Sequence, residues 1–292
     1  MRSDYRLQSL PGISLACVFC FAAGCTEVQQ IAEDSARRSG NPKLADAIKG
    51  SGTLISGLLP IGEEEEQSLG QSIALQVVAR SGGLYEQTDL VRYVNLVGRA
   101  VAATSDRPNL NYRFAVLNDQ TINAFAAPGG YVFVTRGLLK QIKNEAELAA
   151  VLGHEIGHVS QKHMLEVIQR SKQIAGVSEA GLAYATRQPG QYKQLIDVVT
   201  KKVLDEGYDQ GKEIEADRLG VIFAARVGYD ATAYLGLLNR LRNLRGDDRT
   251  LFKTHPNYSA RVTEMEKVFS EKGYVKTGTV LADRFGQVSS KL

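Results

Sequence analysis

The pattern of hydrophobic and polar positions predicts a chain that is mostly helical. In the segment 88–105, apolar residues recur every three or four positions, which is the period of a helix with one buried face. The segment 63–83 opens with four consecutive glutamates and closes with two glycines, which are typical signals for the start and the end of a helix. The same reasoning predicts helices over 136–143, from Glu145 through the histidine-rich segment that follows, and over 172–186, 191–206, 211–228, 231–244 and 259–271.

Two short segments carry the alternation of a strand instead. Residues 111–119 alternate between polar and apolar side chains, and 122–137 reads as two strands on either side of the turn formed by Pro128, Gly129 and Gly130. After this hairpin, Asn144 with Glu147 three positions on makes a capping box for the next helix. The tail after position 273 is expected to be partly extended. The predicted fold class is therefore α+β and mostly helical, with one small β-sheet.

Composition and charge narrow the possible classes of function. The chain has 292 residues, of which 43% are hydrophobic and 23% charged, as in an ordinary globular protein. Its formal net charge of +3 comes from interspersed charges of both signs, so nucleic acid is not expected as a partner. Beyond the N-terminus, no stretch of 18 apolar residues is free of charge, so the body of the chain is not expected to cross a membrane.

The N-terminus has the pattern of a secretory signal. Arg2 and Arg6 precede a short apolar run that closes with "FAAGC" at Cys25, similar to the site at which bacterial lipoproteins are cleaved and lipidated. We therefore expect residues 1–24 to be a lipoprotein signal peptide and 25–60 a lipidated N-terminus and tether. A plain cleaved signal peptide and a buried apolar strand are the alternatives. All three cysteines lie at or before position 25, so no disulfide is expected in the mature chain.

The candidate chemistry is concentrated in one segment, "AVLGHEIGHVSQKH" at 150–163, which holds three of the four histidines. On a helix, His154 and His158 share one face, and two imidazoles at this spacing supply half of a tetrahedral zinc site. Glu155 lies beside His154, within reach of a water molecule at such a metal. His163 is not expected to be a ligand, because it would continue the helix and point about 140° away from His158; it is expected either to support the ligands or to be exposed. Two surface histidines on an exposed helix are the alternative.

A second cluster, "EIEAD", could complete the site. Glu213 and Asp217 are one helical turn apart and face the same way. One carboxylate could bind the metal, while the other accepts a hydrogen bond from the free N–H of a ligating imidazole. Glu215 faces elsewhere and is expected to be solvated. An ordinary charged helix is the alternative reading of this segment.

Taken together, these motifs resemble the gluzincin family of zinc metalloproteases, which includes the CAAX-prenyl proteases, HtpX, mitochondrial OMA1 and the bacterial envelope protease BepA. The resemblance spans roughly 63–266 and rests on five segments in the same order: "NAFAAPGGYVFVTRGLL", "NEAELAAVLG", "HEIGH", "EIEAD" and "THP". No membrane span surrounds these segments and no tetratricopeptide array follows them, so the resemblance is nearest to the small envelope lipoproteins LoiP and YcaL.

The resemblance implies a gluzincin-type metalloprotease domain at 61–292, with the small sheet beside the active-site helix. It implies one Zn²⁺ per chain held by His154, His158 and Glu213, with Asp217 supporting the ligands and Glu155 as the catalytic residue. It also implies a location on the periplasmic face of the envelope, anchored through Cys25. Thr26 follows the cysteine where an Asp would favour the inner membrane of Gram-negative bacteria, so the outer membrane is expected.

The expected activity is cleavage of peptide bonds in misfolded or unassembled envelope proteins, and such proteins are the expected partners. A zinc-containing chaperone or adaptor that binds unfolded chains without cutting them is the alternative, although Glu155 argues against it.

Two details of the expected site remain open. From the sequence alone, His255 in the "THP" segment is an exposed histidine of a polar loop. The resemblance places this loop near the zinc, where His255 is either an oxyanion donor, as Tyr258 and Arg261 are also candidates to be, or a fourth zinc ligand that restrains the enzyme. The strand residues Asn123, Ala124, Phe125 and Ala126 either pair with an extended substrate or form an ordinary hairpin packed on the core.

Overall fold

The computed structural model describes residues 61–175, 189–244, 255, 257–271, 278–290 and 292. The chain divides into two compact units, and all of the elements described below belong to the larger one, except for the last residues of the helix that ends at Ala175. The predicted signal peptide and tether, at 1–24 and 25–60, lie outside the described residues. Among the described helices, none is both long and apolar enough to cross a membrane.

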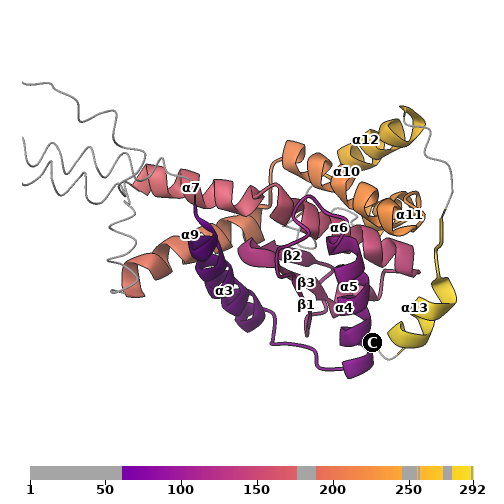
Figure 1. Ribbon diagram of the computed structural model, residues 1–292, viewed down its shortest axis with the longest axis horizontal. Helices are drawn as coiled ribbons and strands as arrows, with labels where there is room; N and C mark the ends of the chain where they lie inside the picture. Colours follow the sequence, from indigo (N-terminus) through magenta and orange to yellow (C-terminus); the bar gives the residue numbers. More distant parts are fainter. Residues whose placement is uncertain (1–60, 176–188, 245–254, 256, 272–277, 291) are drawn as a thin grey trace, which may run out of the picture. The chain divides into compact units, whose positions relative to one another are not determined.

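Helices make up most of the described structure, as the hydrophobic pattern predicts (Figure 1). The longer ones are α3 (Glu63–Arg80), α4 (Thr88–Ala102), α6 (Glu145–Ser160), α7 (His163–Ala175), α9 (Pro189–Glu206), α10 (Gln210–Val227), α11 (Ala233–Leu244) and α12 (Tyr258–Glu271). Two shorter α-helices are α5 (Arg136–Leu139) and α13 (Ala282–Ser289). The α+β, mostly helical fold class is therefore confirmed.

The small sheet has three strands, β1 (Arg113–Leu117), β2 (Ala124–Ala127) and β3 (Tyr131–Thr135), in the order β1-β3-β2. The central strand β3 runs parallel to β1 and antiparallel to β2. The turn between β2 and β3 is a single 3₁₀ turn, η1 (Pro128–Gly130), in which Gly129 has a φ of 73°, a conformation that glycine adopts without strain. Strand β2 thus forms one edge of the sheet, and it lies against α6.

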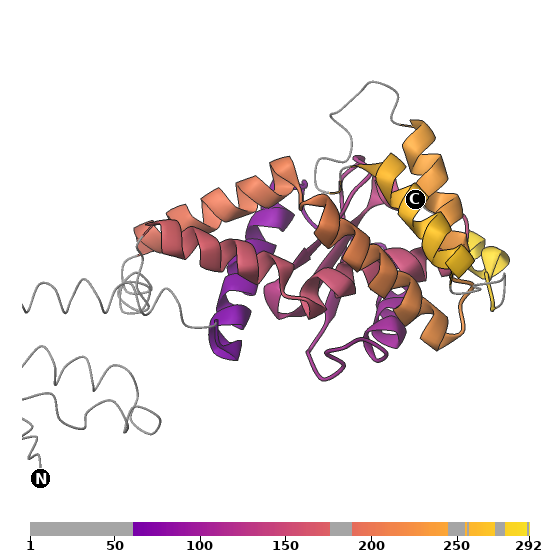
Figure 2. The ribbon, with the colours of Figure 1, turned by 90° about the horizontal axis from the view of Figure 1, so that it is seen from above.

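Helix α6 is buried along almost its whole length, and α10 packs directly across it (Figure 2). The two helices come closest at a pair of glycines. A Cβ atom added to Gly153 would lie 2.7 Å from the carbonyl oxygen of Gly220, and one added to Gly220 would lie 2.7 Å from the backbone nitrogen of His154. Because no side chain fits between them, the two backbones are in contact. This contact sets the face of α10 that carries Glu213 and Asp217 against the face of α6 that carries the histidines.

Two sequence-based expectations about local structure are wrong. Thr135 caps α5 as expected, with its side chain accepting a hydrogen bond from the backbone N–H of Leu138, but that helix ends at Leu139 rather than near 143. The tail is partly extended, as expected, since Thr279 pairs with Tyr229 in a β-bridge, but it also holds α13, which buries Phe285. The helix expected over 172–186 begins earlier, at His163, and residues 176–188 lie outside the described structure.

The helix that carries the histidine motif also ends sooner than expected. Helix α6 stops at Ser160, and Lys162 has a φ of 58°, in the left-handed region, before α7 begins at His163. The expectation that His163 continues the same helix is therefore wrong. The physical reason is a left-handed residue that is not glycine, for which the sequence gives little signal.

Candidate metal centre

The helix that carries His154 and His158 is fixed at its start by a capping network. The side chain of Asn144 accepts a hydrogen bond of 2.9 Å from the backbone N–H of Glu147. Glu147 reaches back and accepts one of 2.8 Å from the backbone N–H of Lys143, and its carboxylate also pairs with Arg240 of α11. The predicted capping box is thus present, with its return bond shifted by one residue. A rigid helix results, with the two histidines one turn apart on the same face.

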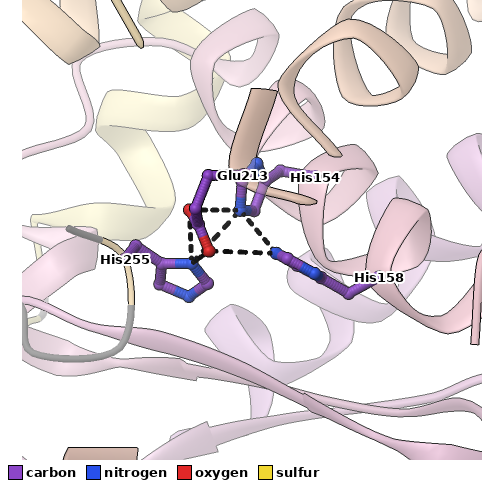
Figure 3. Close-up of side chains that lie close together, drawn as sticks. All are labelled: His154, His158, Glu213 and His255. Atoms are coloured by element: carbon purple, nitrogen blue, oxygen red, sulfur yellow. Dashed lines mark hydrogen bonds and ion pairs between the residues drawn. The ribbon is translucent and has the colours of Figure 1, made fainter. Parts of the chain in front are cut away.

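Four buried side chains from three parts of the chain meet at one point (Figure 3). His154 and His158 come from α6 and Glu213 from the first turn of α10, while His255 lies just before α12. The Nε2 atoms of His154 and His158 are 3.0 Å apart, and each lies 3.6 Å from a carboxylate oxygen of Glu213. Nδ1 of His255 lies 3.3 Å from Nε2 of His154 and 3.0 Å from the nearer oxygen of Glu213.

These distances fit a zinc ion. With zinc–nitrogen and zinc–oxygen bonds of about 2.0–2.1 Å, the ligand atoms of a tetrahedral site lie about 3.3 Å from one another. The separations that involve His154 or Glu213 lie around that value, between 3.0 and 3.6 Å, and all four ligand atoms lie within 4.8 Å of one another. Imidazole nitrogen together with a carboxylate oxygen is also a donor set that zinc prefers. The residues present therefore fit the metal that the resemblance implies.

The state of the histidines suits the same role. Burial, with the neighbouring imidazoles of His154 and His255, holds the pKa of His158 well below its ordinary value, so its ring is neutral. Only a neutral imidazole has a lone pair to give to a metal. For Glu213, burial alone would raise the pKa, but the nearby His255 and Arg261 lower it, so the carboxylate is ionised. His158 and Glu213 are thus in the forms that bind a metal.

Asp217 lies behind His154, in the supporting place that the resemblance implies for it. Its Oδ1 atom lies 2.8 Å from Nδ1 of His154 and accepts a hydrogen bond of 2.7 Å from the hydroxyl of Tyr234. Arg261 donates two hydrogen bonds to the same carboxylate, from Nε at 2.8 Å and from Nη2 at 2.6 Å. Burial would raise the pKa of Asp217, but Arg261 outweighs it and holds that pKa well below its usual range. The imidazole of His154 is therefore fixed with Nε2 toward the cluster.

Arg261 itself is committed to holding carboxylates. Besides its bonds to Asp217, its Nη1 atom lies 3.2 Å from Glu213, and the side chain is only 2% exposed. Tyr258, the other candidate electrophile, lies with its ring under the Arg261 guanidinium, 4.9 Å from it. The structure thus gives Arg261 a supporting place behind the ligands rather than one open to a substrate.

Glu155 and His255 face each other across the site. Nε2 of His255 lies 3.3 Å from Oε1 of Glu155 and 3.3 Å from the backbone oxygen of Ala124 in β2. Burial would lower the pKa of His255, but Glu213 and Glu155 raise it to about 10. The second oxygen of Glu155 is buried and has no hydrogen-bond partner among the described residues. One carboxylate oxygen is therefore available for a proton beside the candidate metal.

The predicted substrate strand lies at this site. Asn123 and Ala124, together with His154, Glu155 and His255, line a small cavity of about 30 Å³. The remaining residues of the strand, Phe125 and Ala126, are buried in β2, which is the edge of the sheet. Both expectations for this segment, a substrate edge and a packed hairpin, are compatible with this placement.

Three side chains lie around His158, and the sequence pointed only to the first two. His163, expected either to support the ligands or to be exposed, is buried, and its Nδ1 atom lies 2.8 Å from Nδ1 of His158. Glu215, expected to be solvated, is 53% exposed, but it also lies 3.1 Å from Nε2 of His163. The ring of Tyr208 stacks on His158 with the ring centroids 4.4 Å apart. Tyr208 precedes α10 by two residues, and only its closeness to "EIEAD" in the sequence could have pointed to it.

Comparisons with known proteins agree with this geometry. A sequence profile of peptidase family M48 matches residues 89–268. The beta-barrel assembly-enhancing protease of Escherichia coli K12 is 30% identical over 229 residues, which is 75% of this chain and 46% of that protein. The mitochondrial metalloendopeptidase OMA1 of Arabidopsis thaliana is 32% identical over 164 residues, 56% of this chain and 33% of that protein.

A shorter relative matches as well. The metalloprotease YcaL of Escherichia coli K12 is 26% identical over 166 residues, which is 56% of this chain and 64% of that protein. The chain spans about half the length of the beta-barrel assembly-enhancing proteases that it matches.

Proposed function

Because the chain belongs to peptidase family M48, we propose that it is a zinc-dependent endopeptidase that cuts misfolded or unassembled proteins at the periplasmic face of a bacterial envelope. The membership confirms the resemblance seen in the sequence motifs. The observation that carries the proposal is the cluster of His154, His158 and Glu213, with the unpaired carboxylate oxygen of Glu155 beside it. Relatives named as beta-barrel assembly-enhancing proteases of bacteria support the class of substrate and the location.

The proposed mechanism divides the work among residues at known places. Zinc held by His154, His158 and Glu213 would polarise the scissile carbonyl and make water acidic enough to ionise near neutral pH. Glu155 takes the proton from the attacking water with its unpaired oxygen and passes it to the leaving amine. Asp217 keeps the imidazole of His154 in the tautomer that can bind metal. Strand β2 would hold the substrate extended through main-chain hydrogen bonds, which suits a protease of unfolded chains.

The experiment that tests the proposal is casein cleavage by the purified protein, with and without a metal chelator. Cleavage that stops on chelation and returns with Zn²⁺ supports a zinc endopeptidase. Binding of unfolded casein without any cleavage, by protein that carries one zinc per chain, would instead identify the zinc-containing chaperone or adaptor.

His255 is proposed to restrain the site as a fourth ligand. Its Nδ1 atom lies 3.3 Å from Nε2 of His154 and 3.0 Å from Glu213, so it could join them on one metal ion by giving up its proton, which metal binding releases. Its Nε2 atom lies 3.3 Å from the Ala124 carbonyl oxygen at the edge of the sheet. In that place it would occupy both the position of the attacking water and a group with which a substrate strand would pair. His255→Ala should therefore raise casein turnover several-fold at equal zinc occupancy.

A control in the same loop separates ligand removal from a looser loop. The side chain of Asn257 bonds to Gln210 at 2.8 Å, and its φ of 69° suits glycine. Asn257→Gly would loosen the loop while leaving the imidazole of His255 in place, and it should change turnover little. If His255→Ala instead lowers turnover about a hundredfold, His255 is an oxyanion donor and the restraint is excluded.

Membrane attachment is proposed to run through Cys25, because "FAAGC" closes a short apolar run. A single acyl chain gives only reversible binding to a membrane, whereas a cysteine that carries several chains is held firmly. Cys25→Ser should therefore move the protein from the membrane fraction to the soluble fraction, or block removal of the signal peptide. Cys20→Ser is the matched control, since Cys20 would leave with the signal peptide, and it should not alter fractionation. Unchanged membrane association of a Cys25→Ser protein from which the signal peptide has been removed would refute the lipid anchor.

A further inference from the structure

The two histidines on α6 are supported in different ways. His154 meets a carboxylate directly, because Nδ1 lies 2.8 Å from Asp217. His158 meets another histidine, because its Nδ1 atom lies 2.8 Å from Nδ1 of His163. The carboxylate appears one step later, where Nε2 of His163 lies 3.1 Å from Oε2 of Glu215. Each histidine is thus linked to an acidic residue of α10. The first arm joins His154 directly to Asp217, and the second arm joins His158 to Glu215 through His163.

Which nitrogen donates each hydrogen bond is determined by the atom of His158 that binds the metal. If Nε2 of His158 gives its lone pair to a metal, the single proton of the neutral ring must be on Nδ1. That proton can be donated only to an unprotonated Nδ1 of His163, so the proton of His163 is on Nε2 and is donated to Glu215. We propose that His163 and Glu215 are positioning residues that hold His158 in its metal-binding tautomer through this chain of two hydrogen bonds. The inference rests on the proposed metal site.

The break between α6 and α7 is what makes the chain possible. The left-handed Lys162, with a φ of 58°, turns the backbone so that His163 returns toward the helix that it follows. His163 is only 3% exposed, and the stacked ring of Tyr208 covers the other side of His158. With its ring enclosed and its Nδ1 atom engaged, His158 has one orientation, and that orientation presents Nε2 to Glu213 and His154.

The two arms differ in how firmly they are anchored. Asp217 is fully buried and held by Arg261, whereas the side chain of Glu215 is 53% exposed. A half-exposed carboxylate is screened by water, so it stabilises the proton on its partner less than a buried one does. We therefore expect the loss of Glu215 to weaken metal binding less than the loss of His163, which leaves the buried N–H of His158 without an acceptor.

Zinc affinity tests the chain without reference to activity. The dissociation constant for Zn²⁺ is measured by competition with a chromogenic chelator, using the full protein. His163→Phe keeps a ring but removes both hydrogen bonds, and it should weaken binding about 10–100-fold, as lost support behind a ligand does. His163→Asn keeps an acceptor oxygen for His158 and should restore most of that loss. Glu215→Ala should weaken binding by a smaller factor than His163→Phe.

The chain offers a matched control for the acidic residue. Glu166 of α7 is 54% exposed, which is nearly the value for Glu215, and it pairs with Lys212 rather than with a histidine. Glu166→Ala should therefore leave zinc affinity unchanged. If Glu166→Ala and Glu215→Ala lose the same amount of zinc affinity, the cause is the loss of one negative charge in general, and the role of Glu215 is overturned. Unchanged affinity in His163→Phe would overturn the role of His163.

The tautomers can be read in the unaltered protein, which removes the question of whether a variant folds. With four histidines in the chain, long-range ¹H–¹⁵N correlation spectra of the zinc-bound protein contain few ring signals. The proposal expects protonated Nδ1 in His158 and protonated Nε2 in His163. A proton on Nδ1 of His163 overturns the chain, even if zinc binds. If the wild-type protein binds no zinc, the proposed function itself fails and takes this inference with it.

Discussion

Glu155→Gln should abolish casein cleavage while the protein keeps one zinc ion per chain. The amide has nearly the shape of the carboxylate but cannot take a proton from water, and the loss of such a general base costs about 10²–10⁴-fold in rate. Zinc should remain because Glu155 is not among the four side chains whose ligand atoms converge. The measurement is the turnover number on casein beside the zinc content of the same sample.

The control for this substitution is Glu166→Gln, which removes one acidic charge from α7 at a half-exposed position. It should retain full activity, so that a loss in Glu155→Gln cannot be assigned to net charge. Should Glu155→Gln lose its zinc together with its activity, Glu155 would be holding the metal or its ligands, and its assignment as the proton carrier would be wrong. The inactive variant, if it keeps zinc, could also trap substrates in cells.

Glu213→Ala should remove both the metal and the activity. Glu213 supplies the carboxylate of the cluster, and its oxygens lie 3.6 Å from the Nε2 atoms of both histidines and 3.0 Å from His255. Glu213 also holds the ring of His255 in place, because its two oxygens lie 3.1 and 3.0 Å from Nδ1 of that ring. Its loss therefore leaves only the two imidazoles of α6 fixed at the site, and these make only half of a tetrahedral site. We expect zinc content near zero after dialysis and casein cleavage at the background rate.

Asp217→Ala is the variant with which the zinc loss of Glu213→Ala should be compared, because Asp217 lies one turn further along the same face of α10. It supports His154 without being a ligand, so its loss should weaken zinc affinity about 10–100-fold rather than remove the site. Since it also leaves the buried Arg261 with one partner fewer, thermal unfolding of both variants should be recorded. Full zinc and full activity in Glu213→Ala would show that the third ligand is misassigned.

The parts of this site that sequence reasoning reaches are those encoded by local signals. His154, Glu155 and His158 lie on one predicted helix with a recognisable capping box, and Glu213 and Asp217 share a helical face by their spacing. Strands β2 and β3 follow from alternation around a turn rich in glycine. Helical periodicity shows which residues share a face of a helix, and this is enough to predict which ligands lie together on each helix.

The parts that sequence reasoning misses depend on backbone turns and distant contacts. The position of His163 depends on the left-handed Lys162, and no glycine marks that break. Helix α13 is only eight residues long and is held by tertiary contacts, in which Phe285 is buried and Arg284 pairs with the buried Glu145 of α6. Short helices of this kind are marginal by themselves, so the local sequence gives little indication of them.

The contact between Gly153 and Gly220 bears on the order in which the protein folds and binds its metal ion. The ligands on α6 and α10 are brought together by two backbones that touch, and no metal-ligating side chain takes part in that contact. This differs from small zinc domains, in which the metal supplies the free energy of folding and the empty chain is unfolded. A chain of this kind can fold first and bind its ion afterwards. The supply of metal in its compartment would then determine when proteolysis begins, but not whether the protein is folded.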